Sequence, residues 1–124
     1  MTPFGEFLEQ LRRSRHLQQK QMADLMGINP CYVSTMEKGR KGPPSMHVLE
    51  QLVKKLQMSQ EEQNQLWRSV QLSELTYRLP VNMSKEEFEL MYEIRSRLGA
   101  LSHAQITIIQ NTLMLGSVPN ARLD

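Results

Sequence analysis

The amino-acid sequence predicts an all-α fold with seven helices, five in an N-terminal domain and two in a C-terminal hairpin. Apolar residues recur three and four positions apart along most of the 124-residue chain. No segment alternates apolar and polar residues around an Asn-Gly or Asp-Gly turn, the pattern of a β-hairpin. The Ser-x-x-Glu/Gln pattern that marks a helix start precedes apolar segments at Ser59, Ser84 and Ser102. We therefore expect two domains, at residues 1–77 and 78–124.

The first predicted helix covers residues 3–15. Thr2 can cap it, and Pro3 suits the first helical position because the amide hydrogen that proline lacks is not needed there. Its apolar residues form one stripe at i, i+3, i+4 and i+7: Phe4, Phe7, Leu8 and Leu11. This stripe predicts that the helix packs on a core.

Two short helices follow at residues 19–26 and 30–38, joined by a tight turn. Gly27 can adopt the positive φ that ends the first of them. Asn29-Pro30 combines a good N-cap residue with a good first helical residue. Gly39 ends the second helix, so these residues predict a compact helix-turn-helix pair.

The fourth predicted helix covers residues 45–56, after a loop with two prolines. We expect its core-facing stripe to be Met46, Leu49, Val53 and Leu56. The fifth helix begins at the Ser59–Glu62 capping box and extends to about Leu75. Its apolar residues at helical spacing are Leu66, Trp67 and Val70.

A connector at residues 77–83 contains Pro80 and marks the predicted domain boundary. Two further helices are expected at residues 84–98 and 102–115, each beginning with a capping box. The tail after Gly116 has no periodicity, and we expect it to fray.

The last predicted helix is apolar on most of its surface, so it needs partners on most sides. The preceding helix offers one face, through Phe88, Met91, Tyr92, the aliphatic stem of Arg95, and Leu98. We expect the remaining surface to meet the same hairpin of a second chain in a C2 homodimer. The predicted interface residues are Phe88, Met91, Tyr92, Ile106, Ile109 and Leu113. In the alternative, this helix packs on the first and fifth helices of its own chain.

Charge is distributed unevenly. Residues 1–58 carry nine Lys/Arg against five Asp/Glu, and residues 59–124 carry six against eight. A basic half is typical of a nucleic-acid-binding module, although a solvated basic face has the same composition. The single cysteine, Cys31, excludes an internal disulfide and a Cys-based zinc cluster. No signal-peptide pattern and no apolar run of ~18–20 residues is present, so we expect a soluble cytoplasmic protein without a membrane segment.

The helix pair at residues 19–39 indicates DNA binding, because the second helix of such a pair can enter the major groove. Its exposed side chains are expected to be small or polar: Asn29, Cys31, Ser34, Thr35 and Lys38. Short side chains let a helix approach base edges, and hydroxyls can bond bases or phosphates. Arg40 and Lys41 follow where the chain would pass the phosphate backbone.

Residues 5–56 resemble the Cro/lambda-repressor-type (Xre) helix-turn-helix family. The matching positions are Leu11, Arg12, Arg15, Leu17, Gln19, Met22, Ala23, Met26, Gly27, Ile28, Tyr32, Val33, Ser34, Met36, Glu37, Lys38, Gly39, Arg40, Pro44, Ser45 and Leu49. The resemblance implies a compact five-helix, lambda-repressor-like DNA-binding domain that usually dimerises on a palindromic operator.

The resemblance also implies roles by position. Base reading falls to Cys31 and Thr35, with Asn29 and Ser34 nearby. Contacts with the DNA backbone fall to Gln19, Lys38, Arg40 and Lys41, and Gln19 could also reach a base edge. Arg12 and Glu37 would form an internal ion pair between the first and third helices. Loss of one partner should then impair folding before recognition.

Three residues depart from the family pattern. Gln18 stands where a Ser or Thr cap is usual, so the helix at residues 19–26 should begin less firmly. Pro30 and Cys31 stand where Gln, Ser or Arg is frequent, so these residues do not reveal the operator sequence. Cys31 either serves as a redox switch or is a small side chain that fits the groove.

Enzyme classes find no support. His16, His47 and His103 are far apart and lack carboxylate or Cys partners at metal-ligand spacing. Ser102 and His103 are neighbours on a helix and do not face each other. We therefore expect no catalytic residue, no metal and no cofactor.

These observations predict a sequence-specific regulator that binds double-stranded DNA, most simply a repressor acting as a homodimer. Repression needs only operator occupancy, and no sensor domain is evident. The alternative is a protein-interaction module in which weak DNA tethering accompanies capture of a partner, such as a cognate toxin or a polymerase subunit.

Overall fold

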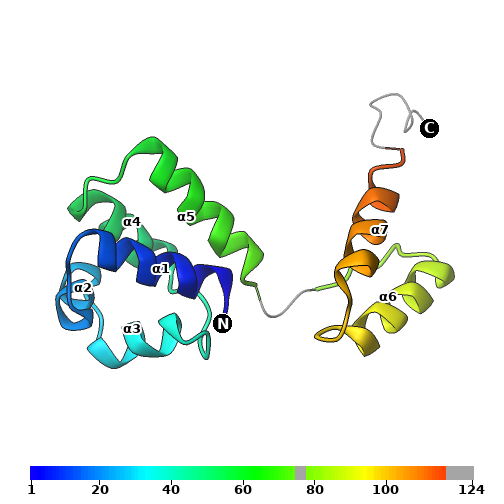
Figure 1. Cartoon of the computed structure of the whole chain (residues 1–124), viewed down its shortest axis with the longest axis horizontal. Coiled ribbons are helices and arrows are strands. Elements are labelled where there is room, and N and C mark those ends of the chain that lie inside the picture. Colours follow the sequence, from blue (N-terminus) through cyan, green and yellow to red (C-terminus); the bar gives the residue numbers. More distant parts are fainter. Residues whose placement is uncertain (75–77, 117–124) are drawn as a thin grey trace. The chain divides into compact units, whose positions relative to one another are not determined.

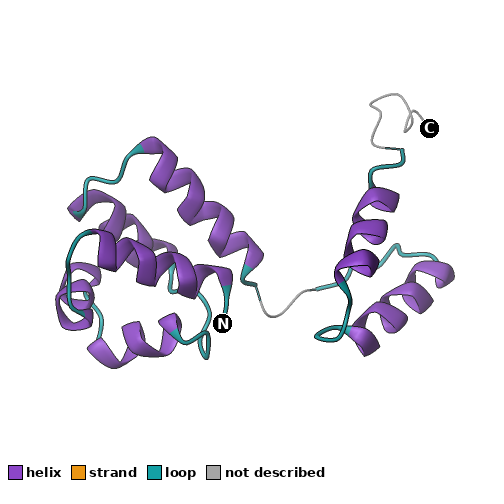
Figure 2. Ribbon diagram, viewed as in Figure 1, coloured by secondary structure: helices purple, strands orange, loops and turns teal. Residues whose placement is uncertain are grey.

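The structure, a computed structural model, describes residues 1–74 and 78–116. Within these residues the chain forms seven α-helices and no strand, which confirms the predicted all-α fold (Figures 1 and 2). The helices are α1 (Pro3–Ser14), α2 (Gln19–Met26), α3 (Pro30–Glu37), α4 (Met46–Lys55), α5 (Gln60–Leu72), α6 (Lys85–Arg97) and α7 (His103–Leu113). Three predictions fall outside the described residues: the helix end at Leu75, the connector start at Tyr77 and the tail at 117–124.

The chain divides into two compact units, Met1–Arg78 and Leu79–Asp124. The first unit holds α1 to α5, in which α1 packs against α3 and α5, and α2 packs against α3 and α4 (Figure 1). The second unit holds α6 and α7. The predicted boundary between residues 77 and 78 stays a prediction, because residue 77 is not described.

The expected caps set most of the helix starts. Side-chain oxygens of six N-cap residues accept a backbone amide of the following turn: Thr2, Asn29, Ser45, Ser59, Ser84 and Ser102. The three predicted capping boxes, which begin at Ser59, Ser84 and Ser102, are all formed. Each cap satisfies amide groups that have no partner within the helix, so the local sequence alone fixes these boundaries.

The core of the first unit is aliphatic and rich in methionine. Its buried apolar residues are Phe4, Leu8, Leu11, Met22, Ala23, Met26, Val33, Met36, Leu49, Leu52, Met58 and Leu66. The stripe predicted for α4 is partly wrong: Met46 is 59% exposed, whereas Leu52 is fully buried. Met46 is the first residue of α4 and lies at the edge of the core, while Leu52 follows Leu49 by one helical turn.

A buried serine joins the start of α1 to the end of α5. The Ser73 hydroxyl accepts a hydrogen bond from the Phe4 amide at 2.8 Å and donates to the Ser69 carbonyl at 2.6 Å. Thr2 accepts from the Gly5 amide at 3.0 Å, so two amides of the first turn of α1 are satisfied. No local sequence pattern links Ser73 to α1, so this role was not predictable from the sequence.

An ion pair also joins α1 to α5. The Arg15 guanidinium donates to both carboxylate oxygens of Glu62, at 2.8 and 2.9 Å. Glu62 is the capping-box residue of α5 and also accepts from the Ser59 amide at 3.0 Å. The Arg15 hydrogen bonds, followed by the Ser59 amide bond, lower the pKa of Glu62 to about 2.

Gly5 lets α1 approach the C-terminal end of α3 closely. A Cβ at this position would collide with the Met36 carbonyl oxygen and would lie 3.1 Å from the Glu37 carbonyl oxygen. At Gly5, α1 contacts the backbone of α3 directly, with no side chain between them. The position of α1 therefore sets the position of α3.

The two helices of the second unit form an open hairpin in which no helical residue is buried. A shallow groove between them is lined by Leu90, Glu93, Ile94, Arg97, Leu101, Gln105, Ile108 and Ile109. The groove uses Leu90 and Ile94 of α6, so the expectation that Phe88 and Tyr92 face α7 is wrong, because at 100° per residue these two lie on the opposite side of α6.

None of the described helices has the length and apolarity needed to cross a membrane.

Candidate nucleic-acid interface

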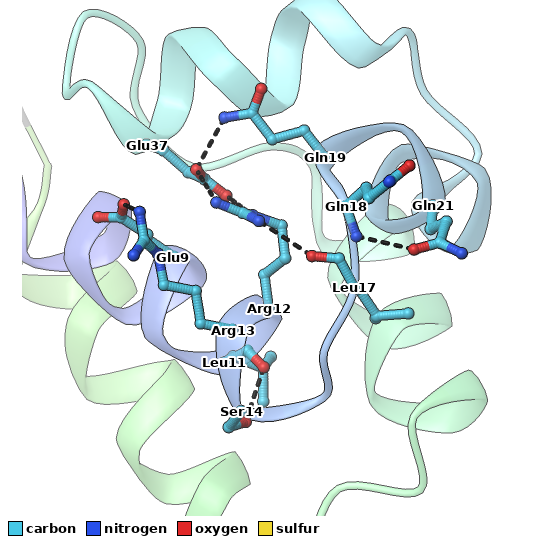
Figure 3. A network of polar contacts seen from close by, with 10 residues as sticks. All are labelled: Glu9, Leu11, Arg12, Arg13, Ser14, Leu17, Gln18, Gln19, Gln21 and Glu37. Carbon is cyan, nitrogen blue, oxygen red and sulfur yellow. Dashed lines mark hydrogen bonds and ion pairs between the residues drawn. The ribbon is translucent and has the colours of Figure 1, made fainter.

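The side chain of Gln18 makes no cap hydrogen bond at the start of α2. Although Gln18 is not a Ser or Thr cap, its backbone amide donates to the side-chain oxygen of Gln21 at 2.8 Å (Figure 3). This is the half of a capping box that a glutamine at the third helical position supplies. The hydrogen bond to Gln21 was not predicted, and the expected weakness of this helix start stays a prediction.

The turn between α2 and α3 has a defined geometry. Gly27 adopts the left-handed conformation with φ of 72°, and the Ile28 amide then donates to the Ala23 carbonyl at 3.0 Å. The Asn29 side chain accepts from the Cys31 amide at 2.8 Å and begins α3. The relative direction of the two helices is therefore fixed by backbone and cap hydrogen bonds.

The inner side of α3 anchors it to the core. Val33 is fully buried and Met36 is 2% exposed. Ile28, at the end of the turn, packs against the same core. Because these residues occupy one side of a helix of only two turns, the opposite side faces outward.

The outward side of α3 carries the predicted base-reading residues. Asn29 and Cys31 are exposed, and Ser34 and Thr35 are half-buried. The Thr35 hydroxyl donates to the Cys31 carbonyl at 2.7 Å, so its proton is already engaged. In this conformation Thr35 can offer DNA its oxygen lone pairs or its methyl group. The four base-reading assignments stay predictions.

Three exposed cations follow the end of α3: Lys38, Arg40 and Lys41, called the cationic rim below. Gly39 turns the chain there with φ of 77°, and the Arg40 amide donates to the Thr35 carbonyl at 3.1 Å. The cationic rim thus lies next to the outward side of α3, where a phosphate backbone would flank a helix in the groove.

Arg12 and Glu37 form the expected ion pair between α1 and α3. The Arg12 Nε and Nη2 atoms donate to the two carboxylate oxygens of Glu37, at 2.7 and 3.1 Å (Figure 3). A third guanidinium nitrogen, Nη1, donates to the Leu17 carbonyl at 2.9 Å. Glu37 is 4% exposed, and its hydrogen bond to Arg12 raises the pKa of the guanidinium above its ordinary value.

Gln19 belongs to this network. Its Nε2 atom donates to Glu37 Oε1 at 2.9 Å, so one amide group of α2 is held against the end of α3 (Figure 3). The single carboxylate of Glu37 therefore connects α1, α2 and α3. The predicted contact of Gln19 with DNA stays a prediction.

The structure adds one residue that the sequence analysis did not assign to the site. Tyr32 lies on the flank of α3, is 47% exposed, and has the Lys41 ammonium 4.4 Å from its ring centroid. An aromatic residue one position after Cys31 was visible in the sequence. Its neighbour Lys41 was not predictable from spacing, because the contact depends on the path of the chain after Gly39.

Among the described residues, no group of three or more His, Cys, Asp or Glu side chains could hold a metal ion. This surface consists of a short, capped helix that is followed by exposed cations. Proteins of the helix-turn-helix class bind nucleic acid with this arrangement.

The chain belongs to the helix-turn-helix domain family, which matches residues 3–66 and therefore covers α1 to α4 and the first half of α5. One relative is an "uncharacterized HTH-type transcriptional regulator RghRB" from Bacillus subtilis (strain 168). It is 36% identical over 61 residues, which cover 49% of this chain and 44% of the relative. The chain thus spans less than half of that relative's length. These matches support the resemblance to the Xre-type family, and no solved structure matches the chain.

Proposed function

We propose that the protein is a sequence-specific regulator of transcription that binds double-stranded DNA as a homodimer. In this proposal α3 enters the major groove, Asn29, Cys31, Ser34 and Thr35 meet base edges, and the cationic rim meets phosphates. The protein acts without catalysis, in the cytoplasm, as a repressor that occupies a palindromic operator.

The observation that carries the proposal is the fixed presentation of α3. The helix is anchored through Val33 and Met36, capped by Asn29 and tied at its end to two other helices through Glu37. Its outward side bears short side chains, so the backbone can come close to base edges. A firmly anchored helix with short side chains and flanking cations is better suited to recognition of a DNA groove than to catalysis.

The C-terminal hairpin supports the homodimer. Phe88, Met91 and Tyr92 are 48%, 38% and 65% exposed on α6, and Ile106 of α7 is 41% exposed. Large apolar side chains exposed on both helices of one hairpin favour a protein partner. A second copy of the hairpin would cover them in a C2 arrangement and would set two copies of α3 on half-sites about 34 Å apart.

DNA binding can be tested with the full chain and a labelled mixed-sequence duplex at several salt concentrations. We expect Lys38→Gln, Arg40→Gln and Lys41→Gln each to weaken binding and to reduce the slope of log K against log salt by about 0.9. Lys54→Gln and Lys55→Gln are matched controls, because these exposed cations end α4. Equal losses for rim and control variants would contradict the proposed interface.

The homodimer can be tested by sedimentation equilibrium. Tyr92→Glu places a charge on the predicted interface and should convert dimer to monomer. Asn111→Glu adds the same charge at an exposed polar position of α7 and should leave the dimer intact. A monomeric wild-type chain would contradict the dimer. It would favour the alternative, in which the exposed hairpin captures a protein partner.

A further inference from the structure

Tyr32 and Lys41 form a contact at the border of the proposed DNA-binding surface. The Lys41 ammonium lies 4.4 Å from the Tyr32 ring centroid, well inside the range of about 6 Å for a cation–π interaction. Tyr32 belongs to α3, whereas Lys41 belongs to the loop that follows it. The contact therefore connects the helix proposed to read bases with a cation proposed to bind phosphate.

The loop around Lys41 lies beside the same flank of α3. Five residues line a shallow pocket together with Tyr32 and Lys41: Ile28, Met36, Gly42, Pro43 and Pro44. Two consecutive prolines restrict the backbone of this loop. The Tyr32 ring borders this pocket on a helix that is packed on the core, and it gives the Lys41 side chain a surface to lie on.

We propose that Tyr32 is a positioning residue for DNA binding, which holds the Lys41 ammonium where the phosphate backbone passes α3. A lysine side chain has several rotatable bonds and loses much of its conformational freedom when it is fixed. A ring that restricts this side chain before binding lowers the cost of ordering it in the complex. Lys41 is exposed, so its ammonium stays accessible to a phosphate oxygen. This inference rests on the proposed function.

The positioning role and a direct phosphate role differ in their salt dependence. Removing the Lys41 charge should lower the salt slope by about 0.9, because one phosphate contact is lost. Removing the ring should weaken binding while the charge remains, so the slope should stay close to that of the wild type. A partial loss of folding would also weaken binding without changing the slope, so each variant must be shown to be folded.

A double-mutant cycle on the full chain tests the proposal, with binding to a labelled mixed-sequence duplex as the readout. We expect Tyr32→Leu to weaken binding about twofold to fivefold, the range of an exposed cation–π contact. Tyr32→Phe keeps the ring and should bind within about twofold of the wild type. In a Lys41→Ala background, Tyr32→Leu should have no further effect.

Lys38 supplies the matched control for this cycle. It is an exposed cation of the same rim, and within the described residues it contacts no aromatic ring. The effects of Tyr32→Leu and Lys38→Ala should therefore add. Circular dichroism and thermal unfolding should report a folded chain for each variant. Tyr32→Met, which can refill the pocket with a flexible apolar chain, replaces Tyr32→Leu if the latter fails to fold.

The outcomes separate the two proposals. If the wild-type chain does not bind the duplex at any salt concentration, the proposed function fails, and the role of Tyr32 fails with it. If the wild type binds and the Tyr32–Lys41 cycle is additive, only the role of Tyr32 is overturned. Tighter binding by Tyr32→Leu, or equal losses for Tyr32→Phe and Tyr32→Leu, would also overturn it.

Discussion

Replacing Glu37 by glutamine tests how the DNA-binding unit is held together. The substitution keeps the shape of the side chain and removes its charge. Glu37 accepts two hydrogen bonds from Arg12 and one from Gln19, and it is 4% exposed. Without the carboxylate, the Arg12 guanidinium, only 13% exposed, keeps its charge but loses its counterion.

The expected cost is large relative to the stability of a small domain. Breaking a buried ion pair by removing one partner costs about 3–5 kcal/mol. The lower end applies here, because Arg12 retains its hydrogen bond to the Leu17 carbonyl. Against a total of about 5–15 kcal/mol, a loss of ~3 kcal/mol leaves a marginal fold. With a urea slope of about 1–1.5 kcal/mol per molar, the midpoint should fall by roughly 2–3 M.

Urea unfolding of the full chain, followed by circular dichroism, provides the measurement. Glu9→Gln is the control, because the Glu9–Arg13 pair is an exposed i,i+4 pair whose loss should cost under ~0.5 kcal/mol. The double variant Arg12→Met/Glu37→Leu should be more stable than Glu37→Gln, since no charge is left buried. The reasoning is refuted if Glu37→Gln unfolds at the same midpoint as Glu9→Gln, or if the double variant is the least stable.

Three further predictions concern the contacts of α1. The pKa of Glu62 is lowered to about 2 by its pairing with Arg15. This pairing stabilises the fold fully above the ordinary carboxyl pKa of about 4.5 and loses its effect as the pH falls toward 2. Glu62→Gln should therefore lower the free energy of unfolding by about 0.5–1 kcal/mol at pH 7 and leave it unchanged near pH 2, as measured by urea unfolding. A loss that does not depend on pH would be inconsistent with this pairing. Ser73→Ala leaves a buried amide of α1 without its acceptor, so it should cost about 1–3 kcal/mol, whereas Ser96→Ala removes an exposed serine-to-carbonyl bond and should be nearly neutral. Gly5→Ala should lower the melting temperature by pushing α1 away from a carbonyl of α3, at a cost of about 1–3 kcal/mol; an unchanged melting temperature would show that α1 can shift freely.

Local sequence signals predicted the helices well because their starts are chemically specified. The caps at Asn29 and Ser59 satisfy backbone groups within a few residues of themselves. The bend at Gly27 has the same local origin, since only glycine adopts a positive φ without strain. These interactions are short in sequence, so the residue types and their spacing were sufficient to infer them.

Contacts between distant segments were not predictable in the same way. Ser73 meets the amide of Phe4 across 69 positions, and Arg15 meets Glu62 across 47. Nothing in the spacing of these residues specifies which partner they find, because that depends on how the helices pack. The Arg12–Glu37 pair came from family resemblance, and the side of α6 that faces α7 was inferred incorrectly from apolar residues on both of its sides.

The location of the site could be predicted from the sequence, but the contacts of its side chains could not. The sequence indicated that one side of α3 is exposed and that cations follow the helix, because capping and charge are local features. It did not indicate that the Thr35 hydroxyl is engaged with the Cys31 carbonyl, or that the Tyr32 ring supports Lys41. Both depend on the conformation of the folded chain, and both bear on which groups are free to meet DNA.

Selection of bound duplexes from a randomised DNA library by the purified full chain tests the central claim most directly. Paired copies of α3 predict enrichment of a palindrome whose half-sites lie one helical turn, about 34 Å, apart. A Thr35→Ala chain should enrich a changed or relaxed motif, because this residue is proposed to touch base edges. The absence of any enriched sequence in the wild-type selection would contradict the account.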